Sequence, residues 1–468
     1  MLSISDKPYA EQSSVKSVTN FYHQYRIGSD LKHAGLYKQR GVPVSTVILY
    51  LISLVYTGKS MFEDFRSATP FAQGFARDTV YRLMNLPSVN WRLLLLSVAG
   101  KIVAFIDTLT DHERLSAFII DDTMYTALYA EKTELVSLVH DHAEKGKNKF
   151  KWGFRLLTLG WTDGVSFIPL CFRHLASSDE TKQRCGCKPN LDKRSRAYQV
   201  RREAISKSPD VVLLMLKAAL KAGIRAKHVL FDSWFAYPVT ITRIKALGLH
   251  VTARVKNAPK IKYLVDGKRK TAKEIYQENR KRRGRSRYLL SVPITLYSTE
   301  NEVTITIPAK LVYVRNRQKR KDWIAILTTD LDLSEEDVIA LYGKRWEIEV
   351  FFKICKSYLK LAGEFQQRSY DAAIAHTTIV MIRYMILSLE KRKQEDPRSL
   401  GGLFYHGFDE AADVKFEQAL LLIMELLAET LMDADLGLAE EQIEQIMDAF
   451  IQKLPWSIRA CLQPGSVA

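Results

Sequence analysis

The sequence predicts an α/β fold, with a β-rich insertion late in the chain and helical regions at both ends. Between residues 115 and 256, short apolar runs typical of buried strands alternate with segments of helical length and periodicity. Two of these runs end in aspartate, and ligands of α/β sheets gather where strands end. The flanking regions, 1–110 and 366–468, are instead predicted to be helical.

The composition describes a folded and strongly basic protein. The chain has 468 residues, 47% of them hydrophobic, which is enough for a sizeable core, and its net charge is +17. The excess is uneven, because residues 256–321 hold nineteen Lys and Arg against five Asp and Glu. A polyanion is the natural partner. We expect a cytoplasmic nucleic-acid protein and no membrane partner, since the chain shows no run of eighteen apolar residues and no signal peptide.

The N-terminal region, residues 1–110, is predicted to be helical and to bind DNA. Its segment FARDTVYRLMNLP has Asp78 as a plausible N-cap, while Arg77 and Arg82 can face outward. Three apolar residues lie beneath them at helical spacing: Val80, Leu83 and Met84. This pattern suits the recognition helix of a helix-turn-helix, although many ordinary amphipathic helices share it.

The first part of the predicted core, residues 111–256, begins with a strand that delivers carboxylates. LSAFIIDDTMY is a short apolar run that ends in Asp121 and Asp122. KWGFRLLTLGWTDGVSFIPLCFRHL contains two further strands, joined by a hairpin turn at residues 162–164. A polar, basic loop is expected to follow over residues 176–208.

A second carboxylate follows a later strand. SPDVVLLMLKAALKAG is predicted to be a helix that closes on Gly223. KHVLFDSWFAYP is then a buried strand that ends in Asp232, and a helix near 238–247 and the strand LHVTARV follow. The predicted order therefore places carboxylates where the first and fourth strands end.

The rest of the chain is predicted to divide into three parts. Residues 257–328 form a basic, β-rich insertion, and residues 329–365 return to the core with a helix that begins near the N-cap Ser334. The C-terminal region, 366–468, is helical, and its segment 408–453 is acidic and leucine-rich.

The stretch LYGKRWEIEVFFKICKSYLKL, residues 341–361, carries an unusual polar stripe. At 100° per residue, four polar side chains fall within a sector about 60° wide on one helical face. They are Tyr342, Arg345, Glu349 and Lys356, and Lys353 joins them. Apolar residues occupy most of the remaining circumference, so the helix is expected to be largely buried. A Glu beside Arg and Lys on a helix is most often part of a salt-bridged surface face. Here the apolar remainder of the helix and the two strand-end aspartates favour a functional face.

Three carboxylates therefore come from rigid elements: one from the Asp121–Asp122 pair, Asp232, and Glu349. Two divalent ions about 3.5–4 Å apart need such a set, because hard Mg²⁺ prefers oxygen ligands. This combination cleaves or joins phosphodiesters. The carboxylates would hold the metal, and the surrounding cations would hold phosphate.

The sequence resembles the DDE transposases of bacterial insertion sequences, in particular the subgroup with a Tyr-x2-Arg-x3-Glu-x6-Lys signature. Residues 342–356 contain that signature complete, IDDTMY resembles the motif of the first aspartate, and LFDSWF resembles that of the second. The resemblance runs from about 115 to 365 and includes the β-rich insertion. It implies a ribonuclease-H-like core.

The resemblance also implies roles for individual residues. Asp122, Asp232 and Glu349 would be catalytic and bind two Mg²⁺ ions, for which Mn²⁺ can substitute. Asp122 is preferred to Asp121 because an aspartate followed by threonine is common at this place in the family, whereas strand alternation leaves both open. The phosphate-binding residues would be Tyr342, Arg345 and Lys356, with Lys353 beside them.

Two further DNA contacts are expected in the insertion. Trp323 lies where relatives place an aromatic that receives a flipped base, and the alternative is an ordinary core tryptophan. The run RKRRGRSR contains Arg282, Arg283 and Arg285, which we expect to contact the DNA backbone. A solvated loop is the alternative for this run.

The sequence thus predicts a metal-dependent transposase that cuts the ends of its own element and joins the 3′-hydroxyls to target DNA. The resemblance adds a cut-and-paste route and a homodimer that uses the C-terminal region, acting at the bacterial nucleoid. Two alternatives remain open: an inactive or domesticated transposase that regulates by binding DNA, and a host nuclease with the same core.

Overall fold

A computed structural model places most of the chain. The residues it describes are 18–38, 40–67, 71, 74–109, 114–140, 150–188, 190–279, 288–300, 302–316, 322–365 and 369–393, with 442–443, 445–446 and 449–450 near the C-terminus. The chain divides into two compact units: Ser17–Val55 with Lys59–Leu403, and Met1–Lys16 with Tyr56–Gly58 and Phe404–Ala468. The expected acidic segment 408–453 lies almost wholly outside the described residues. All that follows concerns the larger unit.

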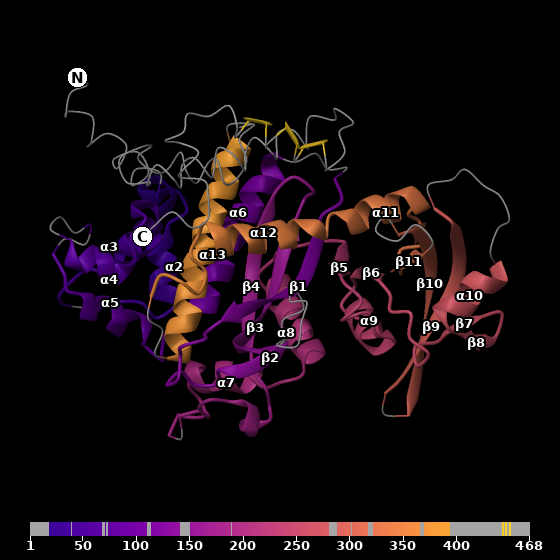
Figure 1. Cartoon of the computed structure of the whole chain (residues 1–468), viewed down its shortest axis with the longest axis horizontal. Coiled ribbons are helices and arrows are strands. Elements are labelled where there is room, and N and C mark those ends of the chain that lie inside the picture. Colours follow the sequence, from indigo (N-terminus) through magenta and orange to yellow (C-terminus); the bar gives the residue numbers. More distant parts are fainter. Residues whose placement is uncertain are drawn as a thin grey trace. The chain divides into compact units, whose positions relative to one another are not determined.

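A mixed β-sheet forms the centre of this unit, as the sequence predicts (Figure 1). The described strands of its first half are β1 (Ala117–Thr126), β2 (Ser137–His140), β3 (Phe150–Thr162), β4 (Phe167–Leu175), β5 (His228–Phe231) and β6 (His250–Arg254). Those of its second half are β7 (Tyr263–Val265), β8 (Lys268–Lys270), β9 (Leu290–Glu300), β10 (Val303–Arg315) and β11 (Trp323–Thr328). Their order is β2-β3-β1-β5-β6-β11-β10-β9-β7-β8, and β4 also pairs with β3. The insertion's strands therefore continue the same sheet.

The pairing of the strands sets the position of the site. β1 runs antiparallel to β3 and parallel to β5, and β5 runs parallel to β6. The β3–β4 hairpin turns at Gly164, as expected, with φ +89°, a conformation that glycine adopts readily. A Cβ at Gly164 would also lie 2.6 Å from the ammonium nitrogen of Lys344, so the turn and the later helices meet there.

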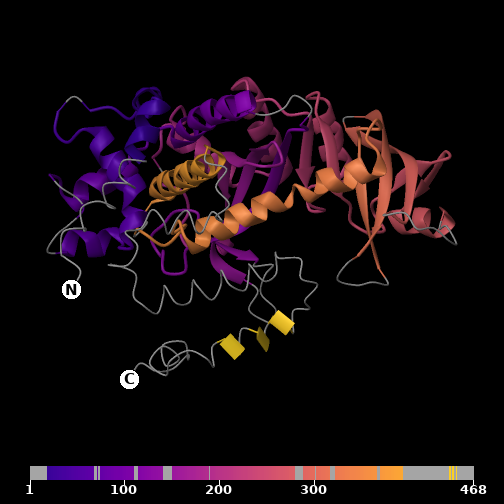
Figure 2. The same ribbon diagram turned by 90° about the horizontal axis from the view of Figure 1, so that it is seen from above.

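Helices pack around the sheet. The described α-helices before and within the core are α2 (Ile27–His33), α3 (Val44–Ser53), α4 (Met61–Arg66), α5 (Arg77–Met84), α6 (Trp91–Leu109), α7 (Arg196–Ala204), α8 (Ser208–Lys221) and α9 (Pro238–Lys245). The later ones are α10 (Ala272–Asn279), α11 (Glu335–Gly343), α12 (Trp346–Ser357) and α13 (Tyr370–Lys393). Figure 2 shows α11 and α12 following one another along the sheet. α12 contacts β1 and β4, and α13 contacts α6, α12 and β4.

Helix α13 is the central apolar support of the unit. It is the one described helix long and apolar enough to cross a membrane, since an 18-residue stretch within Tyr370–Arg392 has a mean hydropathy of 1.5, but that stretch is wholly buried inside the protein. Its buried Arg383 donates to the backbone oxygen of Ile52 and pairs with buried Glu364. These bonds satisfy a charge that would otherwise be costly in the core.

A second buried ion cluster fixes α13 to α7. Arg201 of α7 donates to both carboxylate oxygens of Glu134, at 2.7 and 2.8 Å, and of Asp371, at 3.0 and 2.8 Å. All five donors of a guanidinium suit such bidentate pairs. Loss of the arginine would remove the main cation partner of two buried carboxylates.

Several local predictions were wrong. Residues 176–208 are not one loop, because α7 forms there and packs against β4. The basic start of the insertion holds a short helix, α10, that the charge run concealed. Asp78 lies in the first turn of α5, and Ala76 is the N-cap; Val80, Leu83 and Met84 are buried as expected. β1 continues to Thr126, so both aspartates lie within the strand.

The unfolding free energy is expected to decrease from pH 7 to pH 4 because of His228. This residue is fully buried at the start of β5. Burial lowers the pKa of its imidazole to about 4, although the nearby Asp330 carboxylate opposes the shift. The unfolded chain binds this proton near pH 6.5, so stability present above that pH is lost toward pH 4, by about 3 kcal/mol. The unfolding free energy at each pH can be measured by urea unfolding, with circular dichroism as the signal.

The matched variant is His228→Gln, which cannot titrate. It should lose less stability than the natural protein over the same pH range, whatever its stability at pH 7. Parallel pH profiles for the two proteins would contradict the assignment to His228.

Candidate active site

Strand β1 presents its two neighbouring aspartates to opposite faces of the sheet, as successive residues of a strand must. Asp121 accepts a hydrogen bond from Nη1 of Arg345 at 2.9 Å, across the interface with α12. Asp122 forms an ion pair with Arg155 of β3. The structure therefore turns Asp121, and not Asp122, toward the signature residues.

Asp232 lies beside Asp121. Residues Ile120 of β1 and Phe231 of β5 are partners in a parallel pair, so the next residues along the two strands are Asp121 and Asp232, which face the same side. The Oδ1 atom of Asp232 accepts from the backbone N–H of Trp234 at 2.7 Å, which closes a tight turn after β5. Two carboxylates thus meet at the end of β5.

Glu349 completes the group from the first turn of α12. Its Oε1 accepts from Nη2 of Arg345, one helical turn earlier. Since Arg345 also donates to Asp121, its guanidinium lies between the carboxylates of the strand and the helix. The Nε atom of Arg345 is buried without a hydrogen-bond partner among the described residues. The Nε–H group is therefore available to a further acceptor.

The charges of this group are strongly coupled. The pKa of Asp121 is raised to about 7, mainly by burial and also by the negative charges of Asp232 and Glu349, against the opposing effect of Arg345 and Arg155. A carboxylate with this pKa gains from any additional cation. The site is thus short of positive charge although Arg345 is already present.

The carboxylate oxygens of this group are suitable ligands for a divalent ion, but their present arrangement does not form a metal-binding site. Among the residues that the structure describes, no three His, Cys, Asp or Glu side chains lie close enough together to bind a metal. Arg345 explains this, because its guanidinium occupies the space between Asp121 and Glu349. Asp121, Asp232 and Glu349 offer only carboxylate oxygens, the ligands that Mg²⁺ prefers.

The signature residues span two helices and not one. α11 ends at Gly343 and α12 begins at Trp346, but Arg345 keeps right-handed helical angles, so the polar stripe is preserved. The Arg345 guanidinium lies 5.8 Å from the centre of the Tyr342 ring. Lys356 donates to the hydroxyl of Thr123 at 2.7 Å, on the same face of β1 as Asp121.

The other expected DNA contacts lie away from this group. Trp323 begins β11 and packs against Tyr276 and Tyr313, with ring centres 5.2 and 5.0 Å apart. It is half-buried, so part of its ring remains accessible. Lys353 is exposed on α12. The arginines of the RKRRGRSR run, Arg282, Arg283 and Arg285, lie outside the described residues.

Sequence reasoning missed three residues next to the carboxylates: Arg155, Trp234 and Lys256. Arg155 and Lys256 lie near the Trp234 ring, at 5.3 and 4.4 Å from its centre. Arg155 could have been noticed as a charge in the otherwise apolar strand GFRLLTL. Trp234 could have been noticed as an aromatic two residues after Asp232.

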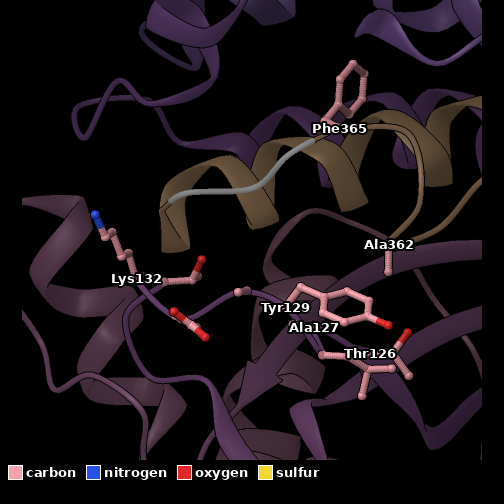
Figure 3. Close-up of a pocket in the computed structure, with 10 residues that line it drawn as sticks. Thr126, Ala127, Tyr129, Lys132, Ala362 and Phe365 are labelled. Atoms are coloured by element: carbon pink, nitrogen blue, oxygen red, sulfur yellow. The ribbon is translucent and has the colours of Figure 1, made fainter. Parts of the chain in front are cut away.

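A pocket of about 710 Å³ lies past the end of β1, away from the carboxylates. It is lined by residues 126–133 with Ala362 and Phe365. Figure 3 shows the Tyr129 ring below Ala362, with Phe365 at the top of the view. The pocket contains none of the three carboxylates, so we do not assign the chemistry to it.

A sheet edge with two neighbouring carboxylates, and with a third carboxylate and cations on the adjoining helix, is suited to binding phosphate esters. The comparison with protein families agrees. The family model described as DDE superfamily endonuclease matches residues 51–321, more than half of the chain, and the chain belongs to that family. DNA is accordingly its substrate. Asp121, Asp122 and Asp232 lie within the match, whereas Glu349 lies beyond it. No curated protein matches the chain.

Replacing Asp121 by Asn is expected to stabilise the metal-free protein at pH 8. A raised carboxyl pKa means that ionised Asp121 costs stability above the unfolded pKa of 3.8, increasingly up to pH 7. Removing that charge should increase the unfolding free energy by on the order of 1–2 kcal/mol. Urea unfolding in EDTA measures the difference, which should vanish at pH 4.

Asp122→Asn is the matched control. It removes the partner of Arg155 and should lower stability at pH 8. Equal effects of the two substitutions would mean that the two aspartates do not occupy different electrostatic environments.

Proposed function

We propose that the protein is a DNA transposase that cuts the ends of its own insertion sequence and joins the 3′-hydroxyl ends to target DNA. One observation carries this proposal: Asp121 and Asp232 adjoin on neighbouring strands, and Arg345 links Asp121 to Glu349 of the signature helix. The residues therefore follow the aspartate, aspartate, glutamate order of the family that the chain belongs to. The first catalytic aspartate is assigned to Asp121 in place of Asp122.

The strand order supports a ribonuclease-H-like core within this proposal. β1 and β3 pair antiparallel, β3 and β4 continue the meander, and β5 and β6 then run parallel to β1. Carboxylates from β1 and β5 consequently meet at one edge, and α12 lies across β1. A fold of this kind places a metal-binding set on rigid elements rather than on loops.

The proposed chemistry assigns separate work to the acidic and basic residues. Asp121, Asp232 and Glu349 would hold two Mg²⁺ ions, which polarise the scissile phosphate and activate the attacking water or 3′-hydroxyl. Arg345 would exchange its carboxylate partners for phosphate oxygens, to which its two Nη atoms and its unpaired Nε can donate. Tyr342 and Lys356 would fix the neighbouring phosphates, and Lys353 would add charge along the same helix.

The proposal includes a homodimer that brings two element ends together, as expected for the C-terminal region, 366–468. Its first helix, α13, is buried within the larger unit, so the contact would have to come from residues after 393. Cut-and-paste transposition would follow if the enzyme separates both paired element ends from the flanking DNA.

Substitution of Asp121, Asp232 or Glu349 should abolish DNA cleavage without abolishing DNA binding. Asp121→Asn, Asp232→Asn and Glu349→Gln each remove one metal ligand and should lower the cleavage rate about 10³-fold or more in Mg²⁺. Binding should remain within a few-fold, because cations supply most of the affinity for DNA. The assays are nicking of DNA that carries the element's ends and gel mobility shift in EDTA.

Asp122→Asn is the control for this test and should retain cleavage within about 10-fold. Loss of cleavage in Asp122→Asn but not in Asp121→Asn would reverse the assignment. If the natural protein binds its ends but never cuts them, it is a DNA-binding regulator. If it cuts branched DNA without regard to those ends, it is a host nuclease.

Neutralising Arg282, Arg283 and Arg285 together should weaken the salt dependence of DNA binding. Each lost phosphate contact lowers the slope of log affinity against log salt by roughly 0.9. The control is the triple alanine variant of Lys217, Lys221 and Arg225, which removes the same charge from exposed positions before β5. These residues lie on α8 and in the segment that leads into the start of β5, whereas Asp232 follows its end, so this control variant should have the slope of the natural protein. Equal slopes for all three proteins would make the arginine run a solvated loop.

A further inference from the structure

Two cysteines lie one residue apart in the segment that leads to α7. Cys185 and Cys187 are separated by Gly186, and both are free thiols, the first half-buried and the second exposed. The other cysteines among the described residues, Cys171 and Cys355, are buried. Of the described thiols, therefore, Cys185 and Cys187 are the two that a reagent in solution can reach.

The spacing of these two cysteines suits an internal disulfide. Even in an extended chain, Cα atoms two residues apart are separated by about 7 Å at most, and a disulfide needs about 4.4–6.8 Å. The chain already bends at Arg184 and Cys185. A Cβ atom at Gly186 would have no neighbour within 4 Å, and glycine adopts many backbone conformations, so the segment has room and freedom to bend further. The bond can therefore close without moving a helix or a strand.

The backbone of this segment is tied to the buried ion cluster of Arg201. The backbone N–H of Leu135 donates to the oxygen of Cys185 at 2.8 Å, and Leu135 has a φ of +62°, which is strained for a leucine. The backbone N–H of Lys188 donates to Oε2 of Glu134 at 3.0 Å. The same oxygen accepts from Nε of Arg201 at 2.7 Å. The cysteine segment thus helps to hold one carboxylate of the cluster.

A shift of Cys187 would reach the cluster directly. Cys187 precedes Lys188, so a bond that draws its sulfur toward the other cysteine moves the N–H group that Glu134 accepts. Glu134 is buried, and a buried carboxylate that loses a donor is destabilised. Because Arg201 joins this carboxylate to Asp371 of α13, the attachment of α7 to α13 would weaken.

We propose that Cys185 and Cys187 form a reversible dithiol–disulfide pair, oxidised by a small disulfide such as oxidised glutathione, and that the disulfide form loosens the attachment of α7 to α13. The Cys187 thiolate attacks one sulfur of the reagent, forms a mixed disulfide and releases one glutathione thiolate. The Cys185 thiolate then attacks the Cys187 sulfur and releases the second glutathione thiolate. Two protein thiols are oxidised, the reagent disulfide is reduced to two thiols, and the protons of the protein thiols pass to the released thiolates.

The test treats the full-length protein with oxidised glutathione, without DNA or metal, and then alkylates the remaining thiols. Mass spectrometry of the peptide that contains both cysteines should show the loss of two hydrogens and no alkyl group. The reaction should be about 10-fold faster at pH 8.5 than at pH 7.5, because burial and the charge of Glu134 raise the pKa of the Cys187 thiol.

Three variants identify the bond. Cys185→Ser should stop at the mixed disulfide and carry glutathione on Cys187, because no second thiol is present to displace it. Cys187→Ser should form no internal disulfide. Cys461→Ala, which removes the cysteine outside the described residues, should react like the natural protein.

Hydrogen exchange of the α7 amides measures the structural effect. Oxidation should speed their exchange about 10-fold, because the cluster loses one donor to a buried carboxylate. The Cys187→Ser protein, treated in the same way, should show no change. Absence of the internal disulfide in the natural protein, or its formation with unchanged exchange in α7, would overturn the proposal. Neither DNA nor metal is present, so the result does not depend on whether the protein cuts DNA.

Discussion

The structure depends on the position of one guanidinium, that of Arg345. It joins Asp121 of β1 to Glu349 of α12, groups that lie 224 and 4 residues from it along the chain. Without a cation there, Asp121, Asp232 and Glu349 would repel one another in a half-buried site, since like charges disfavour joint ionisation. Burial is the main reason that the pKa of Asp121 is raised, and the charges of Asp232 and Glu349 add to it against the opposing effect of Arg345. Arg345 therefore bridges Asp121 and Glu349, and on the proposed function metal ions would have to displace it.

Packing far from the carboxylates decides where this guanidinium lies. Lys344 donates to the backbone oxygen of Leu115 at 3.1 Å, and Glu347 accepts from Thr162 at 2.6 Å, so both sides of Arg345 are fixed to the ends of strands. Further along α12, Phe351 packs between Phe167 and Tyr384, with ring centres 5.1 and 4.8 Å away. α13 in turn is held by the buried pairs of Arg201 and Arg383. A buried charge pair that loses one partner costs about 3–5 kcal/mol, so such support is rigid.

Local pattern was enough to predict the long strands, the hairpin at Gly164 and the sequence of carboxylates along the chain, but it missed the short strands β2, β7 and β8. It was not enough to choose between Asp121 and Asp122. Alternation puts them on opposite faces, but which face meets α12 depends on contacts with Arg345, more than two hundred residues away. The same limit applies to α7, whose helix is fixed by the pairing of Arg201 with Glu134 and Asp371 rather than by its polar, basic sequence.

The position of Arg345 also links metal and DNA binding. Two of its five N–H donors bond Asp121 and Glu349, so those two cannot be offered to a phosphate at the same time. Divalent ions on the carboxylates would release the guanidinium, and a phosphate that captures the guanidinium would free the carboxylates. Each ligand therefore removes an obstacle to the other, and linkage requires that the effect be reciprocal. On the proposed function, the enzyme would be held inactive by its own arginine until DNA and metal are present together.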